Sequence, residues 1–580
     1  MAREIRTRRQ AARLTQRRYS LGRVALAEAH DVLSLLRDFY RVLLGFLVVW
    51  VGVGAILAAQ RHADLPTTLY DVLRLMAFQS SDALPSHDRF LAVMYFLVPF
   101  VAIVLFLPNV LLFGRLVVDK RGRLPSWQVS LAATYRGQVI VCGLGRVGIR
   151  VVTRLIATGY DVVVIEQRWE GRFVERALAL RVPVIVGDAR EAATLRQAGV
   201  MRARAVLTAI DGDLVDIEIA LAARALRPTL RVVLRAFNEE LDRNLEQNFG
   251  RDSVFSASAL AAPTFAAATV SRGMDYVLPV GAGRHLIGVA RVRLAAGTPA
   301  ETPPKLEERL GVRILEGDIG ARRLAAGQAI TLVGTLRAVE AARAVCEGLT
   351  LPPRPTEPET ILVCGLGKVG FRVVLWLAQR EPRPRIVVLT SAETRPSFRQ
   401  TIAALPGVEI IEADARDTET LQRAGITDAA ALAALTSNDQ ANLQIALEAR
   451  RLNPDVHIVL RVFSDALAEK MTDLFGIHTT YSTSELASAT LAASAAVGGI
   501  QWAFPVADHL FGANTLRLAA GHPYIGRDLA GLRAREGVLV VWLRRGDQEA
   551  RLPTLETRLT AGDEITIVGA LAALEGASAR

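Results

Sequence analysis

The sequence predicts an α/β protein with two Rossmann-like, doubly wound parallel-sheet domains, each followed by a small α+β lobe, and preceded by an α-helical membrane region of two spans. Three observations lead to this fold class. Two long uncharged apolar runs lie near the N-terminus, a long segment of the chain is repeated in tandem, and each copy opens with an apolar strand, a glycine turn and a helix. A chain of 580 residues is also too long for a single core.

The apolar runs, 42–59 and 90–114, contain no charged residue. Each is long enough to cross a hydrocarbon core of about 30 Å as a helix. A buried helix of a soluble fold is the alternative, but uncharged runs of this length rarely belong to soluble folds. Arginine is dense in segment 1–41, and basic residues follow the second run. We therefore expect a multi-pass protein of the cell (inner) membrane whose N- and C-termini are cytoplasmic.

The segment between the two spans allows more than one interpretation. Within the segment 66–84, a short helix could dip back into the membrane as a re-entrant loop. A potassium filter would need a glycine-bearing, TVGYG-like strand, and the sequence has none here. Polar residues stand in its place, and they fit either a wide, weakly selective cation pore or an ordinary surface turn: Gln79, Ser80, Ser81 and Asp82.

The tandem repeat is the strongest signal in the sequence. VIVCGLGRVGIRVV at 139–152 recurs as ILVCGLGKVGFRVV at 361–374, and further segments match downstream. Such extended similarity indicates a duplication rather than a chance motif. The expected domains follow a membrane region at 42–118 and a linker at 119–136: a first nucleotide-binding domain at 137–272 with its lobe at 273–350, a Pro-rich linker at 351–359, and a second domain at 360–498 with its lobe at 499–580.

The first copy predicts a nucleotide site. Gly143, Gly145 and Gly148 form GxGxxG directly after an apolar strand, where they permit a tight turn, phosphate approach and close helix packing. The helix N-terminus then offers N–H groups to a phosphate. Glu166 ends the next strand, where a carboxylate accepts hydrogen bonds from ribose hydroxyls. The alternative is a structural turn beside an empty cleft. The remaining residues expected around the ligand are Leu144, Arg146, Val147, Gln167, Asp188 and Ala189.

The second copy keeps the loop glycines but not the carboxylate. Its second strand ends in Thr390, so the ribose contact is either missing or supplied by Glu393. This copy could bind a ligand or serve assembly. Its expected ligand residues are Gly365, Gly367, Lys368, Gly370 and Asp414. Lys368, like Arg146 in the first loop, could meet a phosphate or simply be solvated. Asp414, like Asp188, could contact the base side of a ligand or cap the next helix.

Composition argues against several other functions. The net charge of +11 is concentrated before the first apolar run, without the aromatic-interleaved basic patch of a nucleic-acid binder. The three cysteines lack metal-ligand spacing, and we expect Cys142 and Cys364 to be small buried side chains. The acidic segment 211–218 fits a helix N-terminus better than a calcium loop. The eight histidines form no catalytic constellation, so we expect neither a metal site nor an enzyme.

The repeats resemble regulator-of-potassium-conductance domains, also called TrkA-N or KTN domains with TrkA-C lobes. The resemblance rests on CGLGRVG with Glu166, on GDAR at 187–190, on the RAF and RVF strands and on the two C-terminal lobes, and it covers most of 137–572. Two spans followed by two such domains look like tandem-domain prokaryotic ligand-gated potassium channels, and in outline like the Castor/Pollux type of ion channel.

The resemblance implies a homotetramer in which eight cytosolic domains form a gating ring around one pore. NAD(H), ATP, ADP or a cation would bind the domains and alter the hinge between paired copies. The expected function is thus a nucleotide-regulated membrane channel or transport protein for a monovalent cation, related to potassium. The alternative is a membrane-tethered, nucleotide-sensing regulatory subunit of a separate cation transporter, and the missing filter favours this alternative.

Overall fold

The computed structural model describes residues 124–236, 245–250, 252–295, 302–315, 323–349, 359–464, 479–507 and 509–578, with parts of 40–104 and 467–477. One compact unit holds both repeats and both lobes, and another holds most of the chain before residue 136. Within the described residues, no helix reaches the length and apolarity that a membrane crossing requires. The basic N-terminal segment, Pro-rich linker 351–358 and pore candidates Ser80, Ser81 and Asp82 lie outside those residues.

The first repeat folds into a parallel sheet whose strand order is β3-β2-β1-β4-β5-β6. This is the Rossmann order, in which the chain reverses direction beside the first strand. The strands are rich in Val and Ile, which suits a sheet covered on both faces. The strands are β1 (Val139–Cys142), β2 (Val162–Glu166), β3 (Val184–Val186), β4 (Ala205–Thr208), β5 (Arg231–Arg235) and β6 (Val254–Phe255), and the helices are α6 (Arg146–Ala157), α7 (Val174–Ala179), α8 (Ala192–Gln197) and α9 (Asp213–Leu226).

The second repeat has the same topology, with the order β13-β12-β11-β14-β15-β16 and parallel pairing throughout. The prediction of two doubly wound parallel-sheet domains is therefore confirmed. The strands are β11 (Thr360–Cys364), β12 (Arg385–Thr390), β13 (Val408–Glu412), β14 (Ala431–Ala434), β15 (His457–Arg461) and β16 (Thr480–Tyr481), and the helices are α14 (Lys368–Ala378), α15 (Pro396–Ala403), α16 (Thr418–Arg423) and α17 (Asp439–Leu452).

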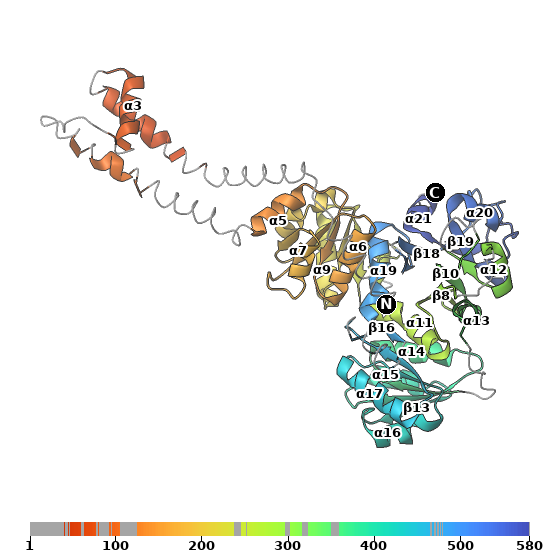
Figure 1. Ribbon diagram of the computed structural model, residues 1–580. Coiled ribbons are helices and arrows are strands. Elements are labelled where there is room, and N and C mark those ends of the chain that lie inside the picture. Colours follow the sequence, from red (N-terminus) through yellow and green to blue (C-terminus); the bar gives the residue numbers. More distant parts are fainter. Residues whose placement is uncertain are drawn as a thin grey trace. The chain divides into compact units, whose positions relative to one another are not determined.

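The last helix of each repeat packs on the other repeat. α11 (Ala257–Val270) follows the first sheet but contacts α14, and α19 (Thr483–Ala496) follows the second sheet but contacts α6 (Figure 1). Both helices are buried along nearly their whole length. Their Ala-rich sequences explain this, because a helix without a polar face is stable only when it is covered on all sides. The two repeats therefore share one core through exchanged helices.

Each lobe is a small antiparallel sheet with helices, in the orders β7-β8-β10-β9 and β17-β18-β21-β19-β20. The lobes pack on each other through an apolar cluster that includes Leu278, Val289, Phe504 and Trp542. Their elements are β7 (Tyr276–Val280), β8 (His285–Arg293), α12 (Pro303–Leu310), β9 (Arg313–Ile314), β10 (Ala329–Thr335), α13 (Leu336–Glu347), β17 (Trp502–Val506), β18 (His509–Arg517), α20 (Leu529–Glu536), β19 (Val538–Arg545), β20 (Gln548–Arg551), β21 (Glu564–Ala570) and α21 (Leu571–Ser578).

The unit before residue 136 contains α3 (Leu65–Met76), which forms part of the segment where a short helix was expected, and α5 (Leu124–Ala133). Val72 and Leu75 of α3 pack with Leu57 and Val98, one from each of the two apolar runs. The indole N–H of Trp50 donates to the carbonyl of Leu69 at 2.8 Å. The pore candidate Gln79 lies just after α3, where its N–H donates to the carbonyl of Arg74.

Candidate functional site

The first glycine loop has the geometry that phosphate binding requires. Gly143 has a φ of +94°, which favours glycine, and the space around the Cα of Gly145 is open. A side chain at Gly148 would overlap the carbonyl oxygen of Gly143, so only glycine lets α6 start this close to β1. Gly145 caps α6 without a side-chain bond, which leaves the helix N-terminus available to an anion.

Glu166 stands at the end of β2 beside this loop. Its carboxylate accepts the N–H of Leu144 at 2.7 Å and the N–H of Gln167 at 2.9 Å. The structure thus brings the predicted carboxylate to the predicted glycine turn. A carboxylate fixed in this way lies where the ribose of a nucleotide is held in dinucleotide-binding folds. The side chains of Leu144, Val147 and Ala189 are buried, so these residues can offer a ligand only their backbone.

The two aspartates that follow the third strands, Asp188 and Asp414, form hydrogen bonds within the turns in which they lie. Asp188 accepts the N–H of Arg190 at 2.9 Å and pairs with its guanidinium, and Asp414 does the same with Arg416. These hydrogen bonds lower the pKa of both carboxyls. The N-caps of the following helices are other residues, Glu191 and Asp417, so the expectation that the aspartates cap these helices is wrong. Contact with the base side of a ligand remains a prediction.

The second glycine loop repeats the backbone but not its surroundings. Gly365 has a φ of +104°, Gly367 is open and Gly370 lies against the carbonyl oxygen of Gly365. Thr390 takes the place of the carboxylate; it is buried, and its hydroxyl lies 2.5 Å from that of Thr394. The proposed substitute, Glu393, is exposed. The second repeat therefore lacks a carboxylate at the end of its second strand.

The cations of the glycine loops lie beside the opposite repeat. The guanidinium of Arg146 lies over the ring of Phe463, 4.3 Å from its centroid, and Arg461 approaches the same ring at 4.7 Å. Arg461 also donates to the carbonyl of Leu435 at 3.2 Å and lies in the field of the Asp439 carboxylate. Burial lowers the pKa of Arg461 to about 10. In the second loop, burial and the nearby Arg395 lower the pKa of Lys368. Positive charge beside an open glycine loop suits an anionic ligand.

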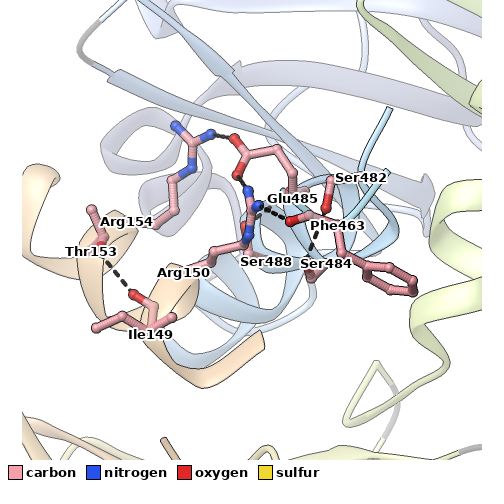
Figure 2. A network of polar contacts seen from close by, with 9 residues as sticks. All are labelled: Ile149, Arg150, Thr153, Arg154, Phe463, Ser482, Ser484, Glu485 and Ser488. Carbon is pink, nitrogen blue, oxygen red and sulfur yellow. Dashed lines mark hydrogen bonds and ion pairs between the residues drawn. The ribbon is translucent and has the colours of Figure 1, made fainter. Parts of the chain in front are cut away.

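A charged cluster ties α6 to the second repeat, as Figure 2 shows. Arg150 and Arg154 of α6 both pair with Glu485 of α19, and Arg150 also donates to the carbonyl of Phe463 at 3.4 Å. Burial opposes ionisation of Glu485, but the two guanidinium groups outweigh it and hold the pKa of this carboxyl below its usual value. The helix that begins at the glycine loop is thereby bonded to the other repeat.

Sequence reasoning did not find these residues of the second repeat. The one available signal was the recurrence of RAF and RVF at the strand ends, which placed an arginine and a phenylalanine at the same position in both copies. The acidic segment 211–218 behaves as expected, since Asp213 and Asp216 lie in the first turn of α9. Within the described part of the chain, no cluster of side chains suits a metal ion. Cys142 and Cys364 are buried, and burial raises the pKa of both thiols, in Cys364 to about 12.

The model of the TrkA-N domain matches residues 139–257 and 361–483, and the model of the TrkA-C domain matches 515–579. A Trk system potassium uptake protein TrkA homolog of Archaeoglobus fulgidus is 26% identical over 338 residues, which are 55% of this chain and 73% of the relative. Another, of Pyrococcus horikoshii, is 32% identical over 102 residues, 18% of this chain and 42% of the relative.

Two solved structures have a similar fold. The GsuK channel superposes with a TM-score of 0.54 at 18% identity, over 94% of this chain and 98% of that one. The GsuK channel bound to NAD gives 0.50 at 17% identity, over 95% and 100%. The glycine loops, the parallel sheets and the matches to both domain models all indicate the same family. The chain therefore belongs to the family built from TrkA-N and TrkA-C domains, the regulator-of-potassium-conductance domains, and it carries them in tandem.

Proposed function

We propose that this protein is a nucleotide-regulated membrane protein of monovalent cation transport, related to potassium, in which the first repeat is the sensor. The observation that carries the proposal is the meeting of Glu166 with the open glycine loop of residues 143–148. NAD(H) or an adenine nucleotide (ATP or ADP) is the proposed ligand. The phosphates would lie at the N-terminus of α6 and the ribose at Glu166. The role is regulatory rather than enzymatic.

The contacts of α6 support a path by which a bound ligand could change the arrangement of the two repeats. A ligand at the start of α6 acts on a helix whose next two turns are bonded to Glu485 and Phe463 of the second repeat. A ligand changes a conformational equilibrium only by its different affinity for the two states. A contact that spans both repeats supplies such a difference, because moving the repeats apart would also change the surroundings of Arg146.

The membrane part of the proposal rests on composition and exposure. The two apolar runs present large side chains that are exposed in the described residues, among them Val48, Ile56, Phe96 and Phe100. A lipid bilayer is a natural cover for such a surface. We further propose a homotetramer with a ring of eight regulator-of-potassium-conductance domains, in the cell membrane with both termini in the cytoplasm.

Calorimetry with NAD, NADH, ATP and ADP on the full chain in detergent tests the sensor. We expect Glu166→Ala to weaken the tightest ligand at least about tenfold, or about 1.4 kcal/mol. Thr390→Ala, at the same position of the second repeat, is the matched control and should leave this affinity unchanged. Equal affinity of wild type and Glu166→Ala would remove the ribose assignment.

Cation flux separates the two candidate functions. Liposomes that contain the purified protein should show potassium flux that changes when nucleotide is added. The missing filter motif favours the second candidate, a membrane-tethered regulatory subunit without its own pore. In that case the isolated protein gives no flux with any ligand, and a transport subunit co-purifies with it.

A further inference from the structure

The two lobes meet through a buried ion pair between equivalent positions. Arg533 donates to both carboxylate oxygens of Glu307, at 2.9 and 2.6 Å, and also to the carbonyl of Ile314 at 2.7 Å. The N–H of Ile314 donates in turn to Glu307 at 2.8 Å. The side chains are 3% exposed for Glu307 and 13% for Arg533. Both partners of this pair are therefore well desolvated and well bonded.

The equivalence of the two positions follows from the helices that carry them. α12 has its N-cap at Thr302 and its C-cap at Gly311, with a φ of +64°. α20 has its N-cap at Asp528 and its C-cap at Gly537, with a φ of +68°. Each helix thus has eight residues between matching caps. Glu307 and Arg533 are both the fifth residue of their helix.

Equivalent residues that touch lie near the pseudo-twofold axis between the lobes. Leu278 and Phe504, which occupy matching positions of β7 and β17, likewise share the cluster between the lobes. In a pair of identical lobes, a residue on the axis meets its own copy. Two first lobes would bring Glu307 against Glu307, and two second lobes would bring Arg533 against Arg533. A buried like-charge contact is strongly unfavourable.

We propose that the Glu307–Arg533 pair makes lobe pairing heterotypic: a first lobe takes a second lobe as its partner and rejects another first lobe. Opposite charges at one axial position allow one of the three possible pairings. The duplicated chain therefore closes its two lobes on each other, and neighbouring chains in an assembly cannot pair lobes of the same kind. The proposal does not depend on nucleotide binding.

A cross-linking experiment on the full chain tests the pairing. Arg284 and Glu549 form an ion pair across the lobes, so Arg284→Cys with Glu549→Cys lets a short bis-maleimide join the lobes within one chain. The three native cysteines are buried and serve as background, measured in a chain without the added cysteines. With native charges we expect efficient intrachain cross-linking.

Variants that change the charge at Glu307 or Arg533 test whether this ion pair sets the lobe pairing. Glu307→Arg places two arginines on the axis and Arg533→Glu places two glutamates there, and each should lower the cross-linking yield at least about tenfold. The swapped chain with both substitutions should recover most of the native yield, although Ile314 then loses its bonds to Glu307 and Arg533. This recovery shows that a low yield in the single variants is not simple misfolding. Native yield in the single variants, or no recovery in the swapped chain, would overturn the proposal.

Mixed chains provide a second measurement. A Glu307→Arg chain that carries Arg284→Cys is co-expressed with an Arg533→Glu chain that carries Glu549→Cys. Each chain alone has repelling lobes, but the first lobe of one matches the second lobe of the other. We expect an interchain cross-link several times more abundant than with the same cysteines and native charges. An unchanged interchain yield would contradict the proposal.

Discussion

The two glycine loops have the same backbone but different charges around them. Both have a glycine with positive φ, an open middle glycine and a third glycine packed against a carbonyl. At two equivalent positions the first repeat has a carboxylate and the second a neutral residue: Glu166 and Thr390, Asp216 and Asn442. At a third position the order is reversed, because the first repeat has Ala259 and the second has Glu485, which packs against α6 of the first repeat. The loop backbone cannot vary without losing the fold, whereas the neighbouring side chains can. The comparison indicates that the carboxylates that can meet a ligand or titrate beside the loop, Glu166 and Asp216, belong to the first repeat.

Asp216 and Asn442 make this contrast most clearly. Asn442 accepts the N–H of Thr436 at 2.9 Å, and its amide donates to the carbonyls of Thr436 and Arg461 at 3.1 and 2.9 Å. Asp216 accepts the N–H of Ile210 at 3.3 Å, but its other oxygen has no partner among the described residues. In the second repeat this position places a hydrogen-bond donor against two carbonyls, and an ionised aspartate cannot donate.

The largest effect is expected for Asp216→Asn at neutral pH. Burial raises the pKa of Asp216 to about 7, against the effects of the Ile210 N–H, the nearby Thr208 hydroxyl and Arg235. The folded protein then binds a proton that the unfolded chain, with a pKa near 3.9, has lost, so this group stabilises the fold below about pH 4 and that stability is lost as pH rises towards 7. Asparagine cannot ionise, so Asp216→Asn removes this loss of stability at higher pH. We expect a gain of a few kcal/mol, at most about 4, in the free energy of unfolding at pH 8.

Thermal unfolding at pH 5 and pH 8 measures this difference. The advantage of Asp216→Asn over wild type should be large at pH 8 and smaller at pH 5. The reciprocal variant, Asn442→Asp, should introduce the same pH dependence into the second repeat, because its carboxylate would face two carbonyls. An advantage that is the same at both pH values would mean that Asp216 does not titrate in this range.

Glu485→Ala should have the next largest effect. It leaves Arg150 and Arg154 with 14% and 17% of their side chains exposed and without this carboxylate. Removing one partner of a buried pair costs about 3–5 kcal/mol, and partial exposure here places the expected loss nearer about 2. Native-state hydrogen exchange of α6 and α19 should show the loss as faster exchange at their contact.

The matched control is Glu485→Gln, which keeps the size and hydrogen-bonding oxygen but removes the charge. It should fall between wild type and Glu485→Ala. Ala259 holds the equivalent position opposite Arg372, which donates to Ser258 instead. If Glu485→Ala leaves exchange in α6 and α19 unchanged, the ion pairs do not hold the two repeats together.

The smallest effect is expected for Thr390→Glu, which gives the second glycine loop the neighbouring carboxylate that the first one has. The new side chain can accept the N–H of Leu366 as Glu166 accepts that of Leu144. We expect the second repeat to bind the nucleotide that the first repeat binds at least about tenfold more tightly, a gain of about 1.4 kcal/mol. Calorimetry in a Glu166→Ala background isolates this site, and Thr390→Gln is the uncharged control. No gain would show that other residues set the difference in ligand binding between the repeats.

The sequence was sufficient for the loop itself. The roles of Gly143, Gly145 and Gly148 follow from steric rules that act within a few residues, and the position of Glu166 follows from a strand next to the first in a parallel sheet. The strand order follows for the same reason, since a βαβ crossover allows few arrangements. The predicted parallel-sheet domains and tandem regulator-of-potassium-conductance domains are therefore confirmed.

The tertiary structure decided what surrounds the loop. Arg150 and Glu485 are 335 positions apart, and no local pattern marks an Ala-rich helix as belonging to the other repeat. The pairing of Glu307 with Arg533 is similar, because each looks like an ordinary surface charge until the two lobes face each other. Sequence by itself determined two copies of one fold with unequal charges. Only the exchanged helices and paired lobes, which bring distant residues into one desolvated interface, gave those charges their partners.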